Sequence, residues 1–406
     1  MRIAHLVPFP IEYYVPLYRE LAQRDDVDLT VYFYSDATTR EFYDSEFART
    51  IEWDIPLLDG YRYEFLPSAR RIGMSGNRFL RRPNWDVIRA VARGRYDVVW
   101  IHGYSHLTSW LAVLAARPFG ARLLLRDAQN LLHPRPFHKR LLKRAALAFL
   151  YRLGAGAYVG EQSRRYFRFY GMPEERLFPV LHCVDDPFFR RRDAELRPRR
   201  AEVRRSFGIV DDAPVILFVG KLIDCKQPLD LVDAYARVAA RQPCWLLVVG
   251  DGPLREAIET RVRDEGVEGV RLAGFVNQAE LPSAYVAADI FVLPSSYEVW
   301  GMVVNEAMNH GLPLVLSDHV GSAVDLVREG WNGFVFPAGD VVALAEALGS
   351  LVRDLDKRRE FGYNSLRLAE TYGVGRTAAA LALAARATAR RFGAEHARPT
   401  ASEEAA

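Results

Sequence analysis

The feature that most constrains the fold is a series of short apolar runs in which polar residues do not alternate with apolar ones. A strand with one face in water alternates, whereas a strand of a parallel sheet is covered by helices on both faces and is apolar throughout. The runs are residues 3–7, 29–33, 98–101, 123–125 and 157–159 in the first half, and 215–219, 246–249, 270–273, 290–293 and 314–316 in the second. Stretches with the apolar spacing of helices separate them, so we predict an α/β protein built from doubly wound parallel sheets.

The runs form two groups, and a stretch rich in charge and proline separates the groups. The length of 406 residues fits two or three domains, at about 150 residues each. We predict a first Rossmann-like domain at residues 1–186, a linker at 187–205 and a second domain at 206–376. A helix at 377–393 follows, for which a return to the first domain is one option. We expect the tail at 394–406 to be disordered.

Composition excludes several classes of protein. Hydrophobic residues make up 50% of the chain and charged residues 26%, as in globular proteins. The three cysteines form no C-x-x-C pair, so we expect no zinc site. A net charge of +3, without aromatic residues interleaved in the basic stretches, argues against nucleic acid as a partner. No run reaches the roughly 20 apolar residues of a membrane span and no leader is visible, so we expect a cytoplasmic location.

Charge is distributed unevenly along the first half. Residues 1–61 contain five arginines and twelve carboxylates, whereas residues 62–152 contain eighteen basic residues and four carboxylates. The densest basic part, residues 138–152, also has apolar residues at helical spacing. It is either a solvated helix flank, or a basic helix attracted to an anionic membrane surface or to a diphosphate-bearing acceptor. A peripheral contact with the inner face of the plasma membrane through 138–152 is therefore one expectation.

A glycine and two lysines follow the first strand of the second half. Gly220 ends the run at 215–219, and Lys221 and Lys226 lie on the loop beyond it. Glycine lets a ligand approach the backbone, and two ammonium groups suit a diphosphate. The alternative is a strand-ending glycine beside two solvated lysines, and this feature alone leaves both interpretations open.

Two glutamates flank the predicted start of a helix after the fourth apolar run of the second half. A helix that begins near Gly301 leaves the N–H groups of Gly301, Met302 and Val303 free to bind phosphate oxygens. Glu306, just over one turn further on, can accept hydrogen bonds from two ribose hydroxyls, and Glu298 would face the sugar side of the phosphates. A surface helix with a favourable acidic residue is the alternative for Glu306. The spacing of the two glutamates favours the binding role.

Two further strand ends carry glycines. Backbone amides at Phe275 and Val276 can pair with the edge of a nucleobase, although a plain strand-to-helix turn explains this segment nearly as well. Gly250 and Gly252 begin a G-x-G pattern after another strand. The third glycine of the dinucleotide fingerprint would stand at position 255, which is arginine. We therefore exclude a nicotinamide-dependent dehydrogenase.

Taken together, residues 213–340 resemble the donor-binding domain of glycosyltransferase family 4. The motifs are Val219-Gly220-Lys221 with Lys226, Val249-Gly250-Asp251-Gly252-Pro253, Gly274-Phe275-Val276, Glu298 with Glu306, Gly311-Leu312-Pro313 before Ser317, and Gly330-Trp331-Asn332-Gly333. Members of this family are retaining enzymes of the GT-B fold, in which two Rossmann-like domains face a central cleft. The first half of the chain matches only in architecture and in Val184-Asp185 before the linker.

The resemblance implies a nucleotide-diphosphate sugar as the donor, with no metal and no other cofactor. Lys221 and Lys226 match the basic pair that neutralises the diphosphate, although the first is more often arginine. Glu306 matches the ribose-binding glutamate, and Glu298 matches the one close to the donor sugar. The single D-x-D motif, Asp354-Leu355-Asp356, lies in a charged helical run that we interpret as surface and not as a metal site.

The acceptor side departs from the family. Many members have a glycine-rich loop after the first strand, where this chain has residues 8–14 without glycine. Many also have a histidine beyond a middle strand of the first domain, where this chain has Arg126 and Asp127. Either this pair or the nearby His102 takes that role.

We therefore predict a retaining, metal-independent glycosyltransferase that moves a sugar from a nucleotide-diphosphate sugar to an acceptor hydroxyl. The acceptor would be a sugar, a lipid-linked molecule or a small molecule, in the synthesis of a polysaccharide, glycolipid or other glycoconjugate. The predicted catalytic set is Glu298, Lys226, Lys221, Asp127 and His102. The alternatives are a non-catalytic subunit that binds nucleotide sugars, and an epimerase or hydrolase of the same fold.

Overall fold

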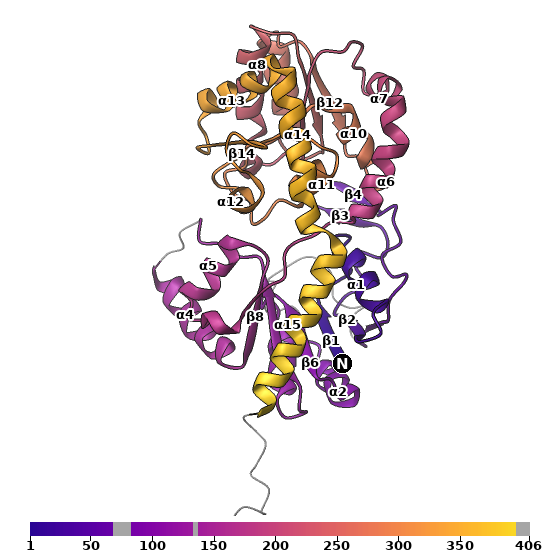
Figure 1. Ribbon diagram of the computed structural model, residues 1–406, viewed down its shortest axis with the longest axis vertical. Coiled ribbons are helices and arrows are strands. Elements are labelled where there is room, and N and C mark those ends of the chain that lie inside the picture. The colour runs from indigo at the N-terminus through magenta and orange to yellow at the C-terminus, as the bar shows by residue number, and fades with distance from the viewer. Residues whose placement is uncertain (68–82, 133–136, 395–406) are drawn as a thin grey trace, which may run out of the picture.

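The computed structural model describes residues 1–67, 83–132 and 137–394. Within these residues the chain forms two domains that lie end to end along the longest axis of the molecule (Figure 1). Each domain contains one large parallel sheet with helices packed against it, which confirms the predicted architecture. None of the helices in the described ranges has the length and apolar character that crossing a membrane requires.

The first sheet places its earliest strand near the middle. In the described part of the chain its seven strands have the order β5-β2-β1-β6-β7-β8-β9, with parallel neighbours. The strands are β1 (Arg2–Val7), β2 (Asp28–Phe33), β5 (Tyr63–Phe65), β6 (Val98–His102), β7 (Arg122–Asp127), β8 (Gly154–Tyr158) and β9 (Leu177–Pro179). The α-helices are α1 (Val15–Ala22), α2 (Asp86–Gly94), α3 (Leu107–Ala116), α4 (Phe137–Arg152) and α5 (Glu161–Phe169). Strand order changes direction at β1, and such sheets bind ligands beyond the carboxyl ends of their strands at this point.

The second sheet repeats this arrangement around β10. Among the described residues its six strands have the order β12-β11-β10-β13-β14-β15, again with parallel neighbours. The strands are β10 (Val215–Val219), β11 (Trp245–Val249), β12 (Val270–Gly274), β13 (Ile290–Leu293), β14 (Leu314–Ser317) and β15 (Gly333–Phe336). The α-helices that follow the first domain are α6 (Asp186–Leu196), α7 (Arg200–Ser206), α8 (Pro228–Ala239), α9 (Arg255–Asp264), α10 (Leu281–Ala287), α11 (Met302–Asn309), α12 (Ala323–Leu326), α13 (Val341–Arg353), α14 (Leu355–Ala369) and α15 (Val374–Ala394). The loops after β1 and β10 therefore both lie where a ligand is expected.

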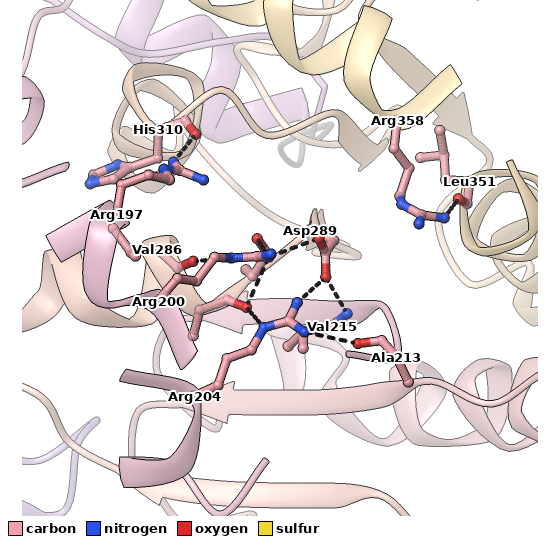
Figure 2. Close-up of polar contacts among 12 residues, drawn as sticks. Arg197, Arg200, Arg204, Ala213, Val215, Val286, Asp289, His310, Leu351 and Arg358 are labelled. Carbon is pink, nitrogen blue, oxygen red and sulfur yellow. Dashed lines mark hydrogen bonds and ion pairs between the residues drawn. The ribbon is translucent and has the colours of Figure 1, made fainter. Parts of the chain in front are cut away.

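The predicted linker at 187–205 is helical and belongs to the second domain, which corrects the prediction. It contains most of α6 and α7, and α7 packs against α10. Asp289 explains the packing: its carboxylate accepts hydrogen bonds from Arg200 at 2.8 Å and from Arg204 at 2.5 Å (Figure 2). The backbone N–H of Val215, at the start of β10, donates to the same carboxylate at 2.8 Å. Basic residues that look like a solvated linker in the sequence thus anchor α7 to the second sheet.

The chain passes between the domains twice, at neighbouring positions. It leaves the first domain before α6, and it returns after α14, because α15 packs against α1 and the first sheet (Figure 1). The carboxylate of Asp186 accepts a 2.7 Å hydrogen bond from the backbone N–H of Val374, which joins the two passages. The predicted helix at 377–393 lies within α15. The tail beyond Ala394 lies outside the described residues.

A small antiparallel ribbon extends from the first domain towards the second. It consists of β3 (Phe42–Asp44) and β4 (Arg49–Ile51), and we call residues 42–54 the arm. Asn277 Nδ2 donates a 2.7 Å hydrogen bond to the carbonyl of Glu52. The backbone N–H of Ala279 donates to the carboxylate of Asp54 at 3.0 Å. The arm therefore connects the two domains (Figure 1).

Candidate functional site

A cavity of about 400 Å³ lies between the domains, beyond the carboxyl ends of β1 and β10. It brings together most of the predicted donor-binding residues from separate loops. Those that line it are Gly220, Lys221, Lys226, Gly250, Phe275, Val276, Glu298, Gly301, Met302 and Val303. Glu306, His102 and Asp127 are not in the lining, and each is described below.

Glycine is required where the loops after β10 and β11 meet. Gly250 has φ of +139°, which side chains rarely allow. A Cβ atom at this position would lie only 1.8 Å from the carbonyl oxygen of Gly220. The backbone N–H of Gly220 donates a 2.9 Å hydrogen bond to the carbonyl of Val249. The two glycines therefore allow a close backbone contact that forms the floor of the cavity.

Lys221 is paired with two carboxylates of the arm. Its Nζ donates to Glu46 Oε2 at 2.6 Å and to Asp44 Oδ2 at 3.1 Å. The same Nζ lies 4.8 Å from the ring centre of Phe47. The cation thus faces the cavity while acidic groups of the other domain neutralise it. A phosphate would compete with these carboxylates for the same ammonium group.

Lys226 is paired with Glu298, the predicted partner of the donor sugar. The Lys226 ammonium forms an ion pair with the Glu298 carboxylate, and both side chains are largely buried. Glu298 Oε1 also accepts a 3.1 Å hydrogen bond from the backbone N–H of Val299. Asn130 of the first domain donates to the Glu298 carbonyl at 3.2 Å, so both domains position this loop. The carboxylate and the ammonium group are therefore held at one point of the cavity wall.

The start of α11 forms the adjacent part of the wall. The helix begins after Gly301, whose φ of +93° turns the chain sharply, and no side chain caps it. Gly301, Met302 and Val303 line the cavity. The first N–H groups of a helix have no partner within the helix and carry a partial positive charge. An anion in the cavity would therefore meet these donors as well as the two lysines.

Glu306 lies directly behind this wall and is fully buried. The hydroxyl of Tyr285 donates a 2.6 Å hydrogen bond to its Oε2. Tyr13 and Gln278, which line the cavity, act on the pKa of this carboxylate, whose Oε1 has no hydrogen-bond partner among the described residues. Burial raises the pKa of Glu306 to about 7. A ligand in the cavity therefore meets Tyr13 and Gln278 before it meets Glu306.

A second carboxylate in the cavity has a similar environment. Burial raises the pKa of Glu12 to about 7, while the charge of Lys221 acts in the opposite direction. Glu12 follows β1, in the segment where the sequence departs from the glycine-rich loop of the family. Its charge also contributes to the raised pKa of Glu306. Protonation near neutral pH therefore changes the charge on both sides of the cavity.

His102 reaches the cavity through Tyr14. A 2.6 Å hydrogen bond joins its Nε2 to the hydroxyl of Tyr14, and Tyr14 lines the cavity. Burial lowers the pKa of His102 well below its usual value, and the guanidinium of Arg126 acts in the same direction. Arg126 is itself buried and donates a 3.0 Å hydrogen bond to the carbonyl of Leu181. His102 is therefore held in its neutral form.

Asp127 lies on the other face of the first sheet. Successive side chains of a strand point to opposite faces, so Arg126 and Asp127 diverge. The Asp127 carboxylate accepts a 3.2 Å hydrogen bond from the backbone N–H of Gln129. Burial raises the pKa values of Tyr104 and Tyr151, which pack on that face, and the charge of Asp127 acts in the same direction. Asp127 therefore does not line the cavity, whereas its neighbour Ala128 does.

Sequence reasoning did not assign the first-domain side of the cavity. That side consists of Ile11, Glu12, Tyr13, Tyr14, Phe47, Trp53, Ala128 and His182. A signal was present in residues 8–14, where two adjacent tyrosines and a glutamate replace the expected glycines. The aromatic residues of the arm gave no comparable signal, because a tertiary contact alone brings them to the cavity.

The D-x-D motif lies at the start of a helix remote from this cavity. Asp354 caps α14 and accepts a 2.9 Å hydrogen bond from the backbone N–H of Lys357. Among residues 1–67, 83–132 and 137–394, no three histidine, cysteine or carboxylate side chains gather as a metal site would need. The absence of a cofactor in the working protein stays a prediction.

Two family models match the chain, one in each domain. A model described as "Glycosyl transferase 4-like domain" matches residues 11–181, and one described as "Glycosyl transferases group 1" matches residues 199–367. The D-inositol 3-phosphate glycosyltransferase of Thermobispora bispora is 30% identical over 310 residues, which cover 71% of this chain and 70% of the relative. The alpha-D-kanosaminyltransferase of Streptomyces kanamyceticus is 32% identical over 199 residues, which cover 48% of this chain and 50% of the relative. The chain thus spans about half the length of this second relative.

Solved structures share the fold over nearly the whole chain. Anabaena HepE, in complex with UDP and glucose, has a TM-score of 0.71 at 19% identity and covers 95% of this chain and 100% of its own. The sucrose-phosphate synthase of Thermosynechococcus elongatus has a TM-score of 0.69 at 19% identity and covers 97% of this chain and 100% of its own. The architecture of two facing Rossmann-like domains is therefore the GT-B fold.

Proposed function

The chain belongs to glycosyltransferase family 4, and we propose that it transfers a sugar from a nucleotide-diphosphate sugar to an acceptor hydroxyl. One observation carries the proposal. Lys221, Lys226 and the start of α11 converge on a single cavity, at the point where strand order changes direction in both sheets. Two ammonium groups and a helix start in one cavity suit a pyrophosphate.

We infer that this cluster stabilises the departing nucleoside diphosphate. Negative charge grows on the leaving phosphate as the glycosidic bond to it breaks, and preorganised cations lower the energy of that transition state. Glu298 would orient the donor sugar through its position beside Lys226. The acceptor hydroxyl would attack from the face that the phosphate leaves, and the phosphate would accept the hydroxyl proton. This proposal gives retention of configuration without a metal or a further cofactor.

We propose a uridine diphosphate sugar as the first donor to test. Support comes from the shared fold of Anabaena HepE, whose structure contains UDP and glucose. Phe275, Val276 and Gly250 line the end of the cavity that lies beyond β11 and β12, where a nucleobase could pair with backbone amides. Glu306 would receive the ribose after Tyr13 and Gln278 move aside.

On the acceptor side we propose the Tyr14–His102 pair. Tyr14 lines the same cavity as the donor residues, and its hydroxyl is hydrogen-bonded to His102. Asp127 is the weaker candidate, because it lies on the far face of β7. The acceptor would be a sugar, a lipid-linked molecule or a small molecule with a free hydroxyl.

We also propose a peripheral membrane contact through α4. Leu141 and Phe149 expose 61% and 48% of their surface, and Arg144 is exposed between them in the sequence. Lys143 is not part of this face, since its Nζ lies 4.8 Å from the ring centre of Tyr166. Sedimentation with vesicles should show binding that depends on anionic lipid and falls in Arg144→Glu. Equal sedimentation with neutral vesicles would contradict the contact.

A nucleotide panel tests the proposed reaction. UDP-, GDP- and ADP-sugars are screened by thermal shift, since a ligand at 100 times its Kd adds about 2.7 kcal/mol to the free energy of unfolding. Release of the nucleoside diphosphate is then measured with and without acceptor, which separates transfer from hydrolysis. Lys221→Ala should lose the shift and Lys357→Ala, a lysine of α14, should keep it. A protein that none of these donors stabilises would contradict the proposal.

A further inference from the structure

The arm places one aromatic side chain of the first domain against the donor-binding loops of the second. Phe47 lines the cavity, although it belongs to the other domain. Its ring meets the ring of Phe275 edge to face, with centroids 5.2 Å apart and an interplanar angle of 83°. Lys221 Nζ lies 4.8 Å from its centroid. Phe47 therefore stands between the proposed nucleobase end and the proposed diphosphate end of the cavity.

The turn that carries Phe47 is built to present it. Asp44 Oδ1 accepts hydrogen bonds from the backbone N–H groups of Glu46 at 2.8 Å and Phe47 at 3.1 Å. The next residue, Ala48, has φ of +52°, a conformation that is unfavourable for a residue with a Cβ atom. Such strain persists only where surrounding contacts enforce it, and it is common at binding sites.

Contacts on both sides of the turn hold the arm in place. Before Phe47, Glu46 pairs with Lys221 at 2.6 Å. After it, the guanidinium of Arg49 lies 4.9 Å from the ring centre of Phe275 and 3.8 Å from the carboxylate of Asp251. The position of the Phe47 ring is therefore fixed by contacts of charged side chains to the loops after β10, β11 and β12.

We propose that Phe47 is a donor-binding residue whose ring forms a wall of the nucleoside subsite. The proposal rests on the proposed function, because it assumes that the cavity takes a nucleoside diphosphate. An apolar ring beside Phe275 gives a base or ribose a surface to pack on. It has no hydrogen-bond donor or charge with which to bind a pyrophosphate. Phe47 should therefore contribute to the affinity for a nucleotide and not to the affinity for pyrophosphate alone.

The test compares two ligands that share the phosphates and differ in the nucleoside. Dissociation constants are measured by calorimetry for inorganic pyrophosphate and for whichever of UDP, ADP and GDP binds the wild type most tightly. Phe47→Ala should weaken nucleotide binding by about tenfold, as loss of a base–aromatic contact does, and leave pyrophosphate binding unchanged. Phe47→Leu should lose less, since it keeps apolar bulk. Tyr43→Ala is the matched control, because Tyr43 lies on the same ribbon and is 62% exposed.

The outcomes separate this proposal from the one on which it rests. Wild-type nucleotide affinity in Phe47→Ala, or an equal loss for both ligands, would overturn the role of Phe47 in the nucleoside subsite. An equal loss for nucleotide in Tyr43→Ala would overturn it too, because the effect would then come from the ribbon as a whole. Lys221→Ala should weaken both ligands. If it binds both as the wild type does, the diphosphate site itself is refuted, whatever Phe47 does.

Discussion

The two domains share a strand order that changes direction at the first strand of each sheet, and they contribute different chemistry to the cavity. The second domain provides glycine loops, two ammonium groups and a helix start. The first provides tyrosines, a histidine and the arm, with the unusual buried Arg126 behind them. The comparison indicates that the second domain provides the positive groups, whereas the first provides an aromatic surface together with carboxylates, which are Glu12 in the lining and Asp44 and Glu46 on the arm. Substitutions in the two halves should therefore change different kinetic constants.

Lys226→Ala should have the largest effect. Removing a cation at the leaving phosphate should lower kcat by about 100- to 1,000-fold, while the fold is kept. Steady-state kinetics and circular dichroism measure the two quantities. Lys357→Ala is the control, since this ammonium group contacts Ser350 on the helix surface. Wild-type turnover in Lys226→Ala would contradict the proposal that the second domain stabilises the leaving phosphate through Lys226.

Glu306→Gln should have the next largest effect, and the effect should depend on pH. A neutral amide accepts hydrogen bonds from ribose hydroxyls less strongly than a carboxylate, so the donor KM should rise about tenfold. Because the pKa of Glu306 is raised to about 7, the wild-type donor KM should also rise as pH falls from 8 to 6. Glu306→Gln should lack the part of this pH dependence that Glu306 causes. An identical pH profile for both proteins would contradict the role of Glu306.

The same group makes a prediction about stability. The folded pKa of about 7 lies above the ordinary 4.5, so the folded protein binds this proton more tightly than the unfolded chain does. The cost of burying the carboxylate is therefore absent below about pH 4.5, grows between pH 4.5 and 7, and is fully present above. The stability of Glu306→Gln relative to the wild type should therefore be greater at pH 8 than at pH 5. Thermal unfolding at the two pH values measures this difference, and a constant difference would contradict it.

Tyr14→Phe should have the smallest effect and should sharpen the comparison. It removes one hydrogen bond to His102, which is worth about 1 kcal/mol, and should raise the acceptor KM several-fold while the donor KM is unchanged. Asp127→Asn, on the far face of the sheet, should lower the melting temperature more than it changes the acceptor KM. A changed donor KM in Tyr14→Phe would contradict the proposal that Tyr14 contacts the acceptor and not the donor.

The sequence predicted the second domain well because its site uses local signals. A glycine at a strand end, a lysine after it and a helix start are each recognisable from a few neighbouring residues, as at Gly220, Lys221 and Gly301. Phe47 and Trp53 are not, because only the folding of the arm across the cleft brings them to the cavity. The linker prediction failed for a related reason. The arginines of α7 look solvated until Asp289, more than eighty residues later, pairs with them.

The hydrogen bond between Asp186 and Val374 has a mechanical consequence. It fastens together the only two covalent passages between the domains in the described chain, through one hydrogen bond from a backbone N–H to a side-chain carboxylate. A rotation about that point that widened the cavity would have to break the links of the arm to the second domain, together with the hydrogen bonds that join Asn130 and Glu161 to it.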